Sequence, residues 1–172
     1  TRVRSSAASD VYKRQHHECE AAQAIAAGHE PYVRHWVHVA MVRYDGEKMS
    51  KSLGNMVFVR DLLRRVPAAT VRLLLASHHH RSSWEYDDSM LQDADERRAR
   101  YEAALRNGRL DDQAAEEHSS RVRALLDDDL NTPDALRVLD EMAADAIAAH
   151  GTAPPRTARE VMTPLLDLVG AV

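Results

Sequence analysis

The chain of 172 residues carries 23 lysines and arginines against 27 aspartates and glutamates, which gives a formal net charge of −4. No apolar run approaches the roughly 20 residues of a membrane span and no signal-peptide core is visible, so neither a membrane protein nor a membrane partner is expected. The single cysteine, Cys19, excludes an internal disulfide framework and fits a reducing compartment, so a cytoplasmic location is predicted.

Residues 1–15, TRVRSSAASDVYKRQ, show no hydrophobic period and end abruptly where an organised pattern begins. They resemble translated adapter or linker sequence, so we expect a non-native or disordered leader. The first helix is predicted from His16 to Ala27, an alanine-rich stretch followed by Gly28, the residue type that commonly ends a helix.

Residues 16–81 read as short elements separated by turn residues, a pattern that indicates the end of an α/β domain. The predicted elements after the first helix are, in chain order, a strand Val37–Val42, a loop at 45–55, an extended run Met56–Val59, a helix Asp61–Val66, and a helix that starts at Pro67 and carries Val71, Leu74 and Leu75 on one face.

Residues 82–172 are predicted to be helical throughout, so the fold class is α/β followed by an all-α helical bundle. Asp87 and Asp88 are N-cap candidates for a helix that ends at Asn107-Gly108. Thr132 is predicted to cap a later helix that has proline at its first position. The expected helices are 88–107, 112–126, 133–150 and 157–169.

Charge changes sign between these two parts. Residues 1–81 carry 13 Lys/Arg against 7 Asp/Glu (+6), and residues 82–172 carry 10 against 20 (−10), which together make −4. Eight of the ten histidines also lie in the first part. This division suggests a phosphate-handling site joined to a support or docking domain that offers nucleic acid a poor electrostatic surface.

The most informative segment is residues 45–55, DGEKMSKSLGN. Glycines near both ends allow a mobile loop, and Lys48, Lys51, Ser50 and Ser52 offer cationic and neutral donors to a polyphosphate. Transfer reactions of nucleoside triphosphates depend mainly on positioning and on stabilising phosphate charge, which suits such a loop. A solvated lysine-serine turn is the alternative.

The eleven residues resemble the KMSKS signature loop of class I aminoacyl-tRNA synthetases, in the form typical of the cysteinyl branch. The resemblance implies that Lys51 contacts phosphate, with Lys48 as a second candidate or a solvated loop lysine. It implies that Ser50 and Ser52 donate to phosphate or cap the turn. Met49 is expected to anchor the loop in an apolar pocket.

A second cluster, HHECE at residues 16–20, predicts half of a metal site. On a helix, His16 and Glu20 lie one turn apart on one face, where an imidazole nitrogen and a carboxylate oxygen can share one zinc ion. An exposed helix-stabilising pair is the alternative. HHECEAAQ resembles the HHENEIAQ segment of cysteinyl-tRNA synthetases, which implies that His16 and Glu20 bind zinc together with two cysteines outside this chain. Cys19 departs from that segment, where asparagine is usual.

Three further groups of residues carry expectations of their own. Trp36 and His38 resemble a family segment that leads into the loop, so they either line the floor near the adenylate or serve as core residues. The histidines at 78–80 are expected to precede Arg81 without forming a second metal site. The aspartates at 127–129 are expected to form a helix entry and not a catalytic carboxylate cluster.

The resemblance spans about residues 16–170 and implies a C-terminal fragment of a cysteinyl-tRNA synthetase. Residues 16–81 would be the end of a Rossmann-like catalytic domain, and residues 82–172 an incomplete DALR-like helical domain. The implied activity is ATP-dependent cysteine activation, with magnesium and zinc, and transfer to tRNA(Cys) by a monomer. No HIGH-type sequence is visible, so the chain alone is expected to be inactive. The alternatives are the cysteine:glucosaminyl-inositol ligase of mycothiol biosynthesis and a non-catalytic helical interaction module.

Overall fold

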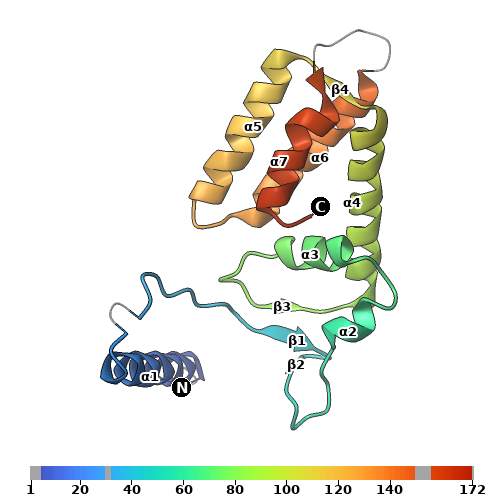
Figure 1. Cartoon of the computed structure of the whole chain (residues 1–172). Helices are drawn as coiled ribbons and strands as arrows, with labels where there is room; N and C mark the ends of the chain where they lie inside the picture. The colour runs from blue at the N-terminus through green and yellow to red at the C-terminus, as the bar shows by residue number, and fades with distance from the viewer. Residues whose placement is uncertain (1–4, 30–31, 150–155, 172) are drawn as a thin grey trace. The chain divides into compact units, whose positions relative to one another are not determined.

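The structure is a computed structural model that describes residues 5–29, 32–149 and 156–171, with the backbone alone described for residues 5–14. The chain divides into two compact units, one up to His38 and the other from Val39 onward (Figure 1). In the described residues, no helix combines the length and the apolar character that crossing a bilayer requires.

The first unit contains helix α1, Ser5–Ala26. The predicted start at His16 is therefore wrong, because the residues directly before it, Lys13, Arg14 and Gln15, are good helix formers and no proline or glycine lies in α1. The predicted end is confirmed. Gly28 adopts a φ of +84°, its N–H donates to Ile25, and the N–H of His29 donates to Ala24, which together satisfy the last carbonyls of the helix. The foreign origin of residues 1–15 stays a prediction.

The second unit opens with a small sheet of order β2-β1-β3. Strand β1 (Val42–Tyr44) pairs antiparallel with β2 (Glu47–Lys48) and parallel with β3 (Trp84–Glu85). The predicted strand Val37–Val42 is wrong except at its last residue, because the ladder with β3 begins only there. Val37 is 60% exposed instead of being buried in a sheet.

Two helices follow the loop. Helix α2 covers Val59–Leu62 and α3 covers Ala68–Ala76. The predicted extended run Met56–Val59 forms no strand and its last residue belongs to α2, although the backbone of Phe58 is extended. The predicted helix does not last to Val66, since α2 ends at Leu62. Pro67 precedes α3 as predicted, but Leu75 is 53% exposed, since α3 buries the adjacent face formed by Thr70, Val71, Leu73 and Leu74.

The remaining helices are α4 (Asp88–Asn107), α5 (Asp112–Asp127), α6 (Thr132–Ala148) and α7 (Ala158–Leu168). This all-α part confirms the predicted fold class. Asp87 caps α4 as predicted, whereas Asn131, and not Thr132, caps α6 through its side-chain oxygen. Strands β4 (Arg109–Leu110) and β5 (Arg156–Thr157) form a short antiparallel pair that links the start of α5 to the start of α7. The sequence did not predict this pair.

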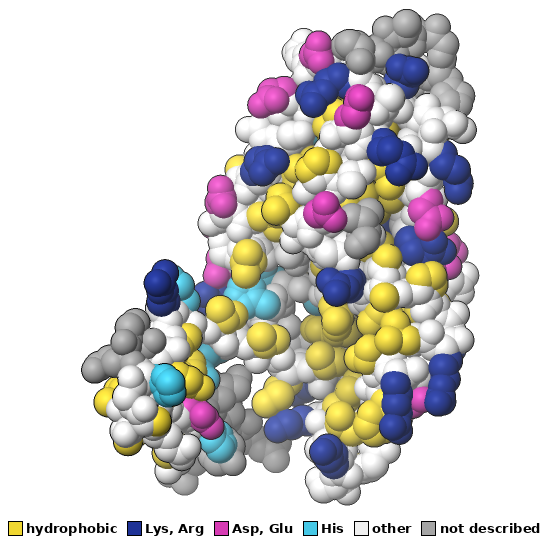
Figure 2. All heavy atoms as spheres, in the orientation of Figure 1, with side chains coloured by type: hydrophobic (Ala, Val, Ile, Leu, Met, Phe, Trp, Pro, Cys, Tyr) yellow, Lys and Arg dark blue, Asp and Glu magenta, His cyan; other side chains and the backbone are white. Residues whose placement is uncertain are grey.

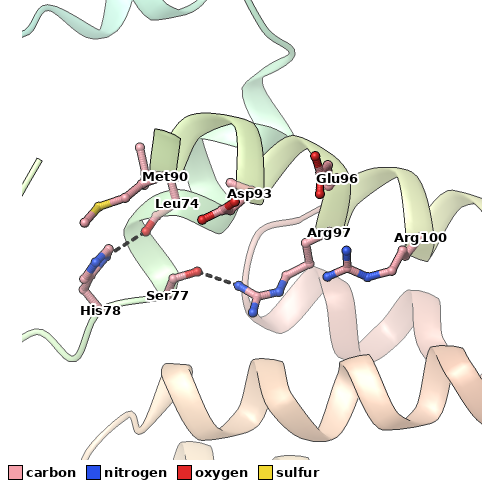
Figure 3. A pocket seen from close by; sticks show the side chains of 9 residues that line it. Leu74, Ser77, His78, Met90, Asp93, Glu96, Arg97 and Arg100 are labelled. Atoms are coloured by element: carbon pink, nitrogen blue, oxygen red, sulfur yellow. Dashed lines mark hydrogen bonds between the residues drawn. The ribbon is translucent and has the colours of Figure 1, made fainter. Parts of the chain in front are cut away.

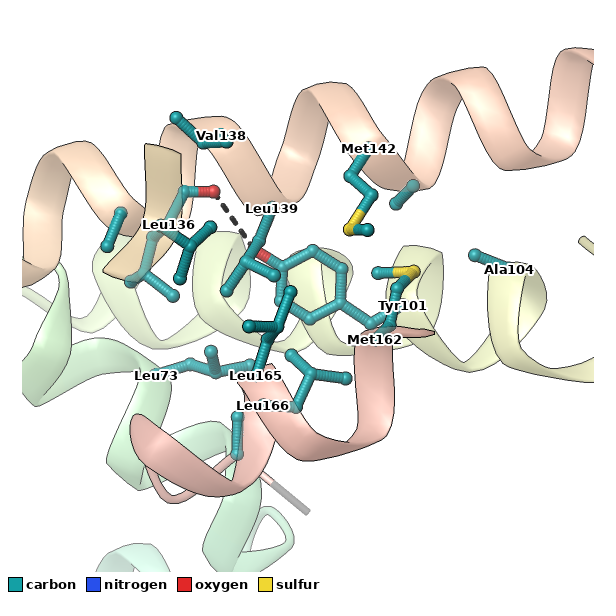
Figure 4. Packing of buried hydrophobic residues seen from close by; sticks show 14 of the residues in the cluster. Leu73, Tyr101, Ala104, Leu136, Val138, Leu139, Met142, Met162, Leu165 and Leu166 are labelled. Carbon is teal, nitrogen blue, oxygen red and sulfur yellow. Dashed lines mark hydrogen bonds between the residues drawn. The ribbon is translucent and has the colours of Figure 1, made fainter. Parts of the chain in front are cut away.

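One hydrophobic core joins α3 to the bundle (Figure 4). Its fully buried side chains come from α3, α4, α5, α6, α7 and β4, and the hydroxyl of Tyr101 donates to the carbonyl of Leu136 at 3.2 Å. Because α3 packs directly on α4, the segment after the signature loop is anchored to the helical part. The residues labelled in this core include Leu73, Leu139, Met142, Met162, Leu165 and Leu166.

Candidate functional site

The predicted signature loop begins on a β-hairpin. Asp45 and Gly46 join β1 to β2 with φ values of 54° and 75°, the left-handed pair that a two-residue type I′ turn requires. An Asp-Gly pair meets this requirement at low cost, so the local sequence dictates the turn. The hairpin places Lys48 at the last residue of β2, where the loop starts.

The loop itself is closed by one side chain. The Asn55 amide oxygen accepts from the N–H of Ser50 at 2.9 Å, and its amide nitrogen donates to the carbonyl of Lys48 at 3.3 Å. The Ser50 and Ser52 hydroxyls lie 3.2 Å apart, and Ser50 Oγ also accepts from the N–H of Leu53. The serine hydroxyls therefore stabilise the turn in this structure, which is one of the two roles predicted for them.

The two lysines of the loop face the solvent. Lys48 and Lys51 are exposed, and within the described residues neither forms an ion pair. Met49 is half-buried and packs against the hydrophobic core, as expected for an anchor of the loop. The loop thus exposes two ammonium groups to solvent on a backbone that Met49 and Asn55 hold in place. This arrangement suits the binding of a polyphosphate.

A contact from outside the motif reaches the hairpin. The Gly46 N–H donates to Oε1 of Glu85 on β3 at 2.7 Å. Sequence reasoning missed Glu85, since a single acidic residue far along the chain carries no local signal.

The predicted metal ligands lie on α1. His16 and Glu20 are one helical turn apart and both are exposed, so the helix places their donors on one side as expected. Cys19 is also exposed. The described residues contain no group of three or more His, Cys, Asp or Glu arranged to hold a metal ion. These residues thus fit half of a tetrahedral site and need further donors.

Trp36 and His38 contact α1 through His17. The imidazole of His17 stacks on Trp36 with ring centroids 4.0 Å apart, and its Nδ1 lies 3.1 Å from Nε2 of His38. Trp36 is 46% exposed, so it is not a fully buried core aromatic. Their predicted place near the adenylate stays a prediction.

The segment before β3 binds the turn between α5 and α6. Arg81 donates from Nε to Asp129 Oδ2 at 2.5 Å and from Nη2 to Oδ1 at 2.8 Å. Nε2 of His79 and of His80 lie 3.9 and 3.8 Å from the same carboxylate. The hydrogen bond from Arg81 and the positive charge of its guanidinium group lower the pKa of Asp129. The aspartate run therefore lies at a helix–helix turn, as predicted, and one member has a partner that the sequence did not indicate.

A cleft of about 430 Å³ lies between α3 and α4 (Figure 3). Arg97 donates to Ser77 Oγ at 2.7 Å and binds Asp140 at 3.1 Å, so its charge is already neutralised. Asp93 and Glu96 balance Arg97 and Arg100 around the lining. On the face seen in Figure 2, acidic and basic side chains are likewise interspersed over the helical bundle. Neither the cleft nor this surface of the bundle therefore indicates a binding site for a ligand of strong positive or negative charge.

Comparison with known families gives two matches. A family described as the tRNA synthetases class I (C) catalytic domain matches residues 8–96, and the DALR domain family matches residues 121–170. The first match contains the signature loop, His16 and Glu20, and it includes residues 8–15 of the presumed leader.

Individual relatives carry two kinds of name. An L-cysteine:1D-myo-inositol 2-amino-2-deoxy-alpha-D-glucopyranoside ligase of Streptomyces griseus is 48% identical over 80% of this chain and 34% of its own length. The ligase of the same name from Streptosporangium roseum is 42% identical over 89% of this chain and 38% of its own length. A cysteine–tRNA ligase of Tolumonas auensis is 44% identical over 81% of this chain and 31% of its own length. The chain thus spans about a third of each relative.

Proposed function

Because this chain belongs to the family of class I tRNA synthetase (C) catalytic domains, with a DALR domain after it, we propose that its protein activates cysteine with ATP and transfers it to tRNA(Cys). The observation that carries the proposal is the intact signature loop, in which Lys48 and Lys51 are exposed on a closed turn. A non-catalytic module would have no physical need for this pair of exposed lysines.

Activation exchanges one bond for another at phosphorus. A carboxylate oxygen of cysteine bonds to the α-phosphorus of ATP, and the bond from that phosphorus to the leaving pyrophosphate breaks. Negative charge builds on the phosphate oxygens as this happens. The ammonium group of Lys51, and secondarily that of Lys48, therefore stabilises the transition state more than it stabilises the complex with bound cysteine. Magnesium accompanies the ATP as a substrate ion.

Zinc is proposed as the cofactor for selecting cysteine. The donor set fits, since His16 supplies nitrogen and Glu20 oxygen from one side of α1, and the remaining ligands would come from outside this chain. Bound there, zinc would favour the soft thiolate of cysteine over the hydroxyl of serine. The two protein residues hold and orient the ion, and they take no part in the bond changes at phosphorus.

A second acceptor is favoured by a specific observation. Relatives named for an aminosugar-inositol acceptor match this chain at 42–48% identity, the same range as the tRNA ligase. The two candidates share adenylate formation and differ in whether the amine of an aminosugar or a hydroxyl at the tRNA 3′ end attacks the adenylate. The role proposed for Lys51 is the same with either acceptor, whereas a carboxylate at Glu20 is expected for the tRNA ligase and not for the aminosugar ligase.

The test uses a full-length protein that contains this chain. Cysteine-dependent exchange of pyrophosphate into ATP measures activation without an acceptor, and Lys51→Ala should lower its rate by about 10²–10³, the loss typical of one charge-stabilising donor. The KM for cysteine should change little. Arg64→Ala, which removes an exposed cation outside the loop that pairs with Asp61, is the control and should leave the rate unchanged.

Three outcomes would contradict parts of the proposal. No exchange by the zinc-loaded wild type would refute both enzyme functions. An equal loss of rate and cysteine affinity in Lys51→Ala would refute the phosphate role. Supplying tRNA(Cys) and glucosaminyl-inositol separately identifies the acceptor, and transfer to the aminosugar alone would replace tRNA(Cys) in the proposal.

A further inference from the structure

The turn of the signature hairpin is held by a carboxylate from a distant strand. Asp45 and Gly46 are the two central residues of the turn, and the Gly46 N–H has no place in the β1–β2 ladder, which pairs Tyr44 with Glu47. That N–H instead donates to Glu85 Oε1 at 2.7 Å. A bond from an amide to a carboxylate is charge-assisted and stronger than a bond to a neutral oxygen.

Glu85 is itself anchored on both sides. Trp84 stacks on His78 with ring centroids 3.9 Å apart and planes 10° apart. The Tyr86 N–H donates to the carbonyl of Arg43 at 2.8 Å, and the Tyr86 side chain is buried in the core. Because both neighbours are fixed, the backbone of Glu85 gives its carboxylate a defined position next to the turn.

The hairpin in turn carries the reacting part of the loop. Lys48 ends β2, and its carbonyl is the acceptor through which Asn55 closes the loop around Lys51. A hairpin of two or three residues per strand is weak by itself. A tether at its turn therefore restricts the direction in which both lysines leave the sheet.

We propose that Glu85 is a positioning residue for the signature loop, acting through the Gly46 N–H on Lys48 and Lys51. The effect of Glu85 on catalysis rests on the proposed function, whereas its hydrogen bond to Gly46 is independent of that function. Because the turn is exposed, water replaces the carboxylate when it is removed, so the fold is retained while the hairpin gains freedom. The loss then falls on the rate of adenylate formation and spares cysteine binding.

The experiment compares three variants of the full-length protein in cysteine-dependent pyrophosphate exchange. Glu85→Ala should lower kcat about tenfold, which corresponds to about 1.4 kcal/mol, with the KM for cysteine unchanged. Glu85→Gln keeps an oxygen acceptor and should stay within about twofold of wild type. Glu47→Ala removes an exposed carboxylate from the same hairpin and controls for the change in charge beside the lysines.

A second measurement does not need activity. Amide hydrogen exchange at Gly46 should accelerate about tenfold in Glu85→Ala and remain near wild type in the other two variants. Unchanged kcat in Glu85→Ala, an equal loss in Glu85→Gln, or an equal loss in Glu47→Ala would overturn the positioning role. A wild type that shows no pyrophosphate exchange refutes the proposed function, and in that case the Gly46 amide still decides whether Glu85 holds the turn.

Discussion

Replacing Gly108 with alanine tests the packing that joins the helices of the bundle. Gly108 has an ordinary extended backbone, with φ −68° and ψ 151°, so alanine is not excluded by its torsion angles. Space is the constraint. An added Cβ would lie 2.5 Å from the carbonyl oxygen of Ala104, 3.0 Å from Cβ of Ala146 and 3.1 Å from Cβ of Ala158.

The magnitude follows from how rigid these neighbours are. Ala104, Ala146 and Ala158 are fully buried and belong to α4, α6 and α7 respectively, so no flexible side chain can move aside. Overpacking of this kind costs about 1–3 kcal/mol. Alanine also restricts the unfolded chain, which offsets about 0.4–1 kcal/mol. We expect a net destabilisation of about 1–2 kcal/mol, or a fall in Tm of about 2–8 °C for a chain of this size.

The assay is urea denaturation of the 172-residue chain followed by circular dichroism, with the free energy of unfolding taken from linear extrapolation. Asn107→Ala, at the exposed neighbouring position, is the control and should stay within about 0.5 kcal/mol of wild type. If Gly108→Ala were as stable as wild type or more stable, the close approach of the helices at this glycine would be refuted.

Three further predictions concern the hydrophobic core and the ion pair between Arg81 and Asp129. Leu139→Ala removes a fully buried side chain of α6 and should destabilise the chain by about 2–5 kcal/mol in the same urea assay, whereas a loss below 1 kcal/mol would contradict its burial. Tyr101→Phe removes the hydrogen bond to Leu136 and should cost about 0.5–1.5 kcal/mol, with no change expected if the hydroxyl were solvated instead. Asp129→Asn weakens the pair with Arg81. Because the folded-state pKa of Asp129 lies below its ordinary 3.8, its stabilisation is present above that pH and is lost as the pH falls through the folded value. The stability difference between wild type and Asp129→Asn should therefore be seen at pH 7 and shrink as the pH falls below 3.8, and a difference that does not shrink would refute the ionic origin.

Helix ends were predictable where one residue type settles the backbone locally. Gly28 ends α1 because only a left-handed residue closes that turn, and Asp87 caps α4 with a side-chain oxygen that the sequence places beside the first free N–H groups. Asn131 was missed in favour of Thr132, because both side chains can cap a helix and only the backbone geometry chooses between them.

Short strands were not predictable in the same way. The apolar run from Val37 to Val42 satisfies every local criterion for a strand, yet only its last residue pairs, because the partner β3 comes about 40 residues later. The prediction that Leu75 lies on the buried face of α3 is wrong for a related reason. Apolar residues occupy several faces of that helix, and the position of α4 decides which face is covered.

The candidate site likewise contains residues that the local sequence identifies and a contact that only the tertiary structure shows. Lys48, Lys51, Ser50 and Ser52 could be identified from the sequence alone because they lie within eleven consecutive residues whose turn chemistry is local. The sequence also placed His16 and Glu20 on one side of a helix, since a spacing of four determines that by itself. The contact of Glu85 with the hairpin is visible only in the tertiary structure, because hydrogen bonds between distant segments depend on how the chain returns to itself and not on the residues beside them.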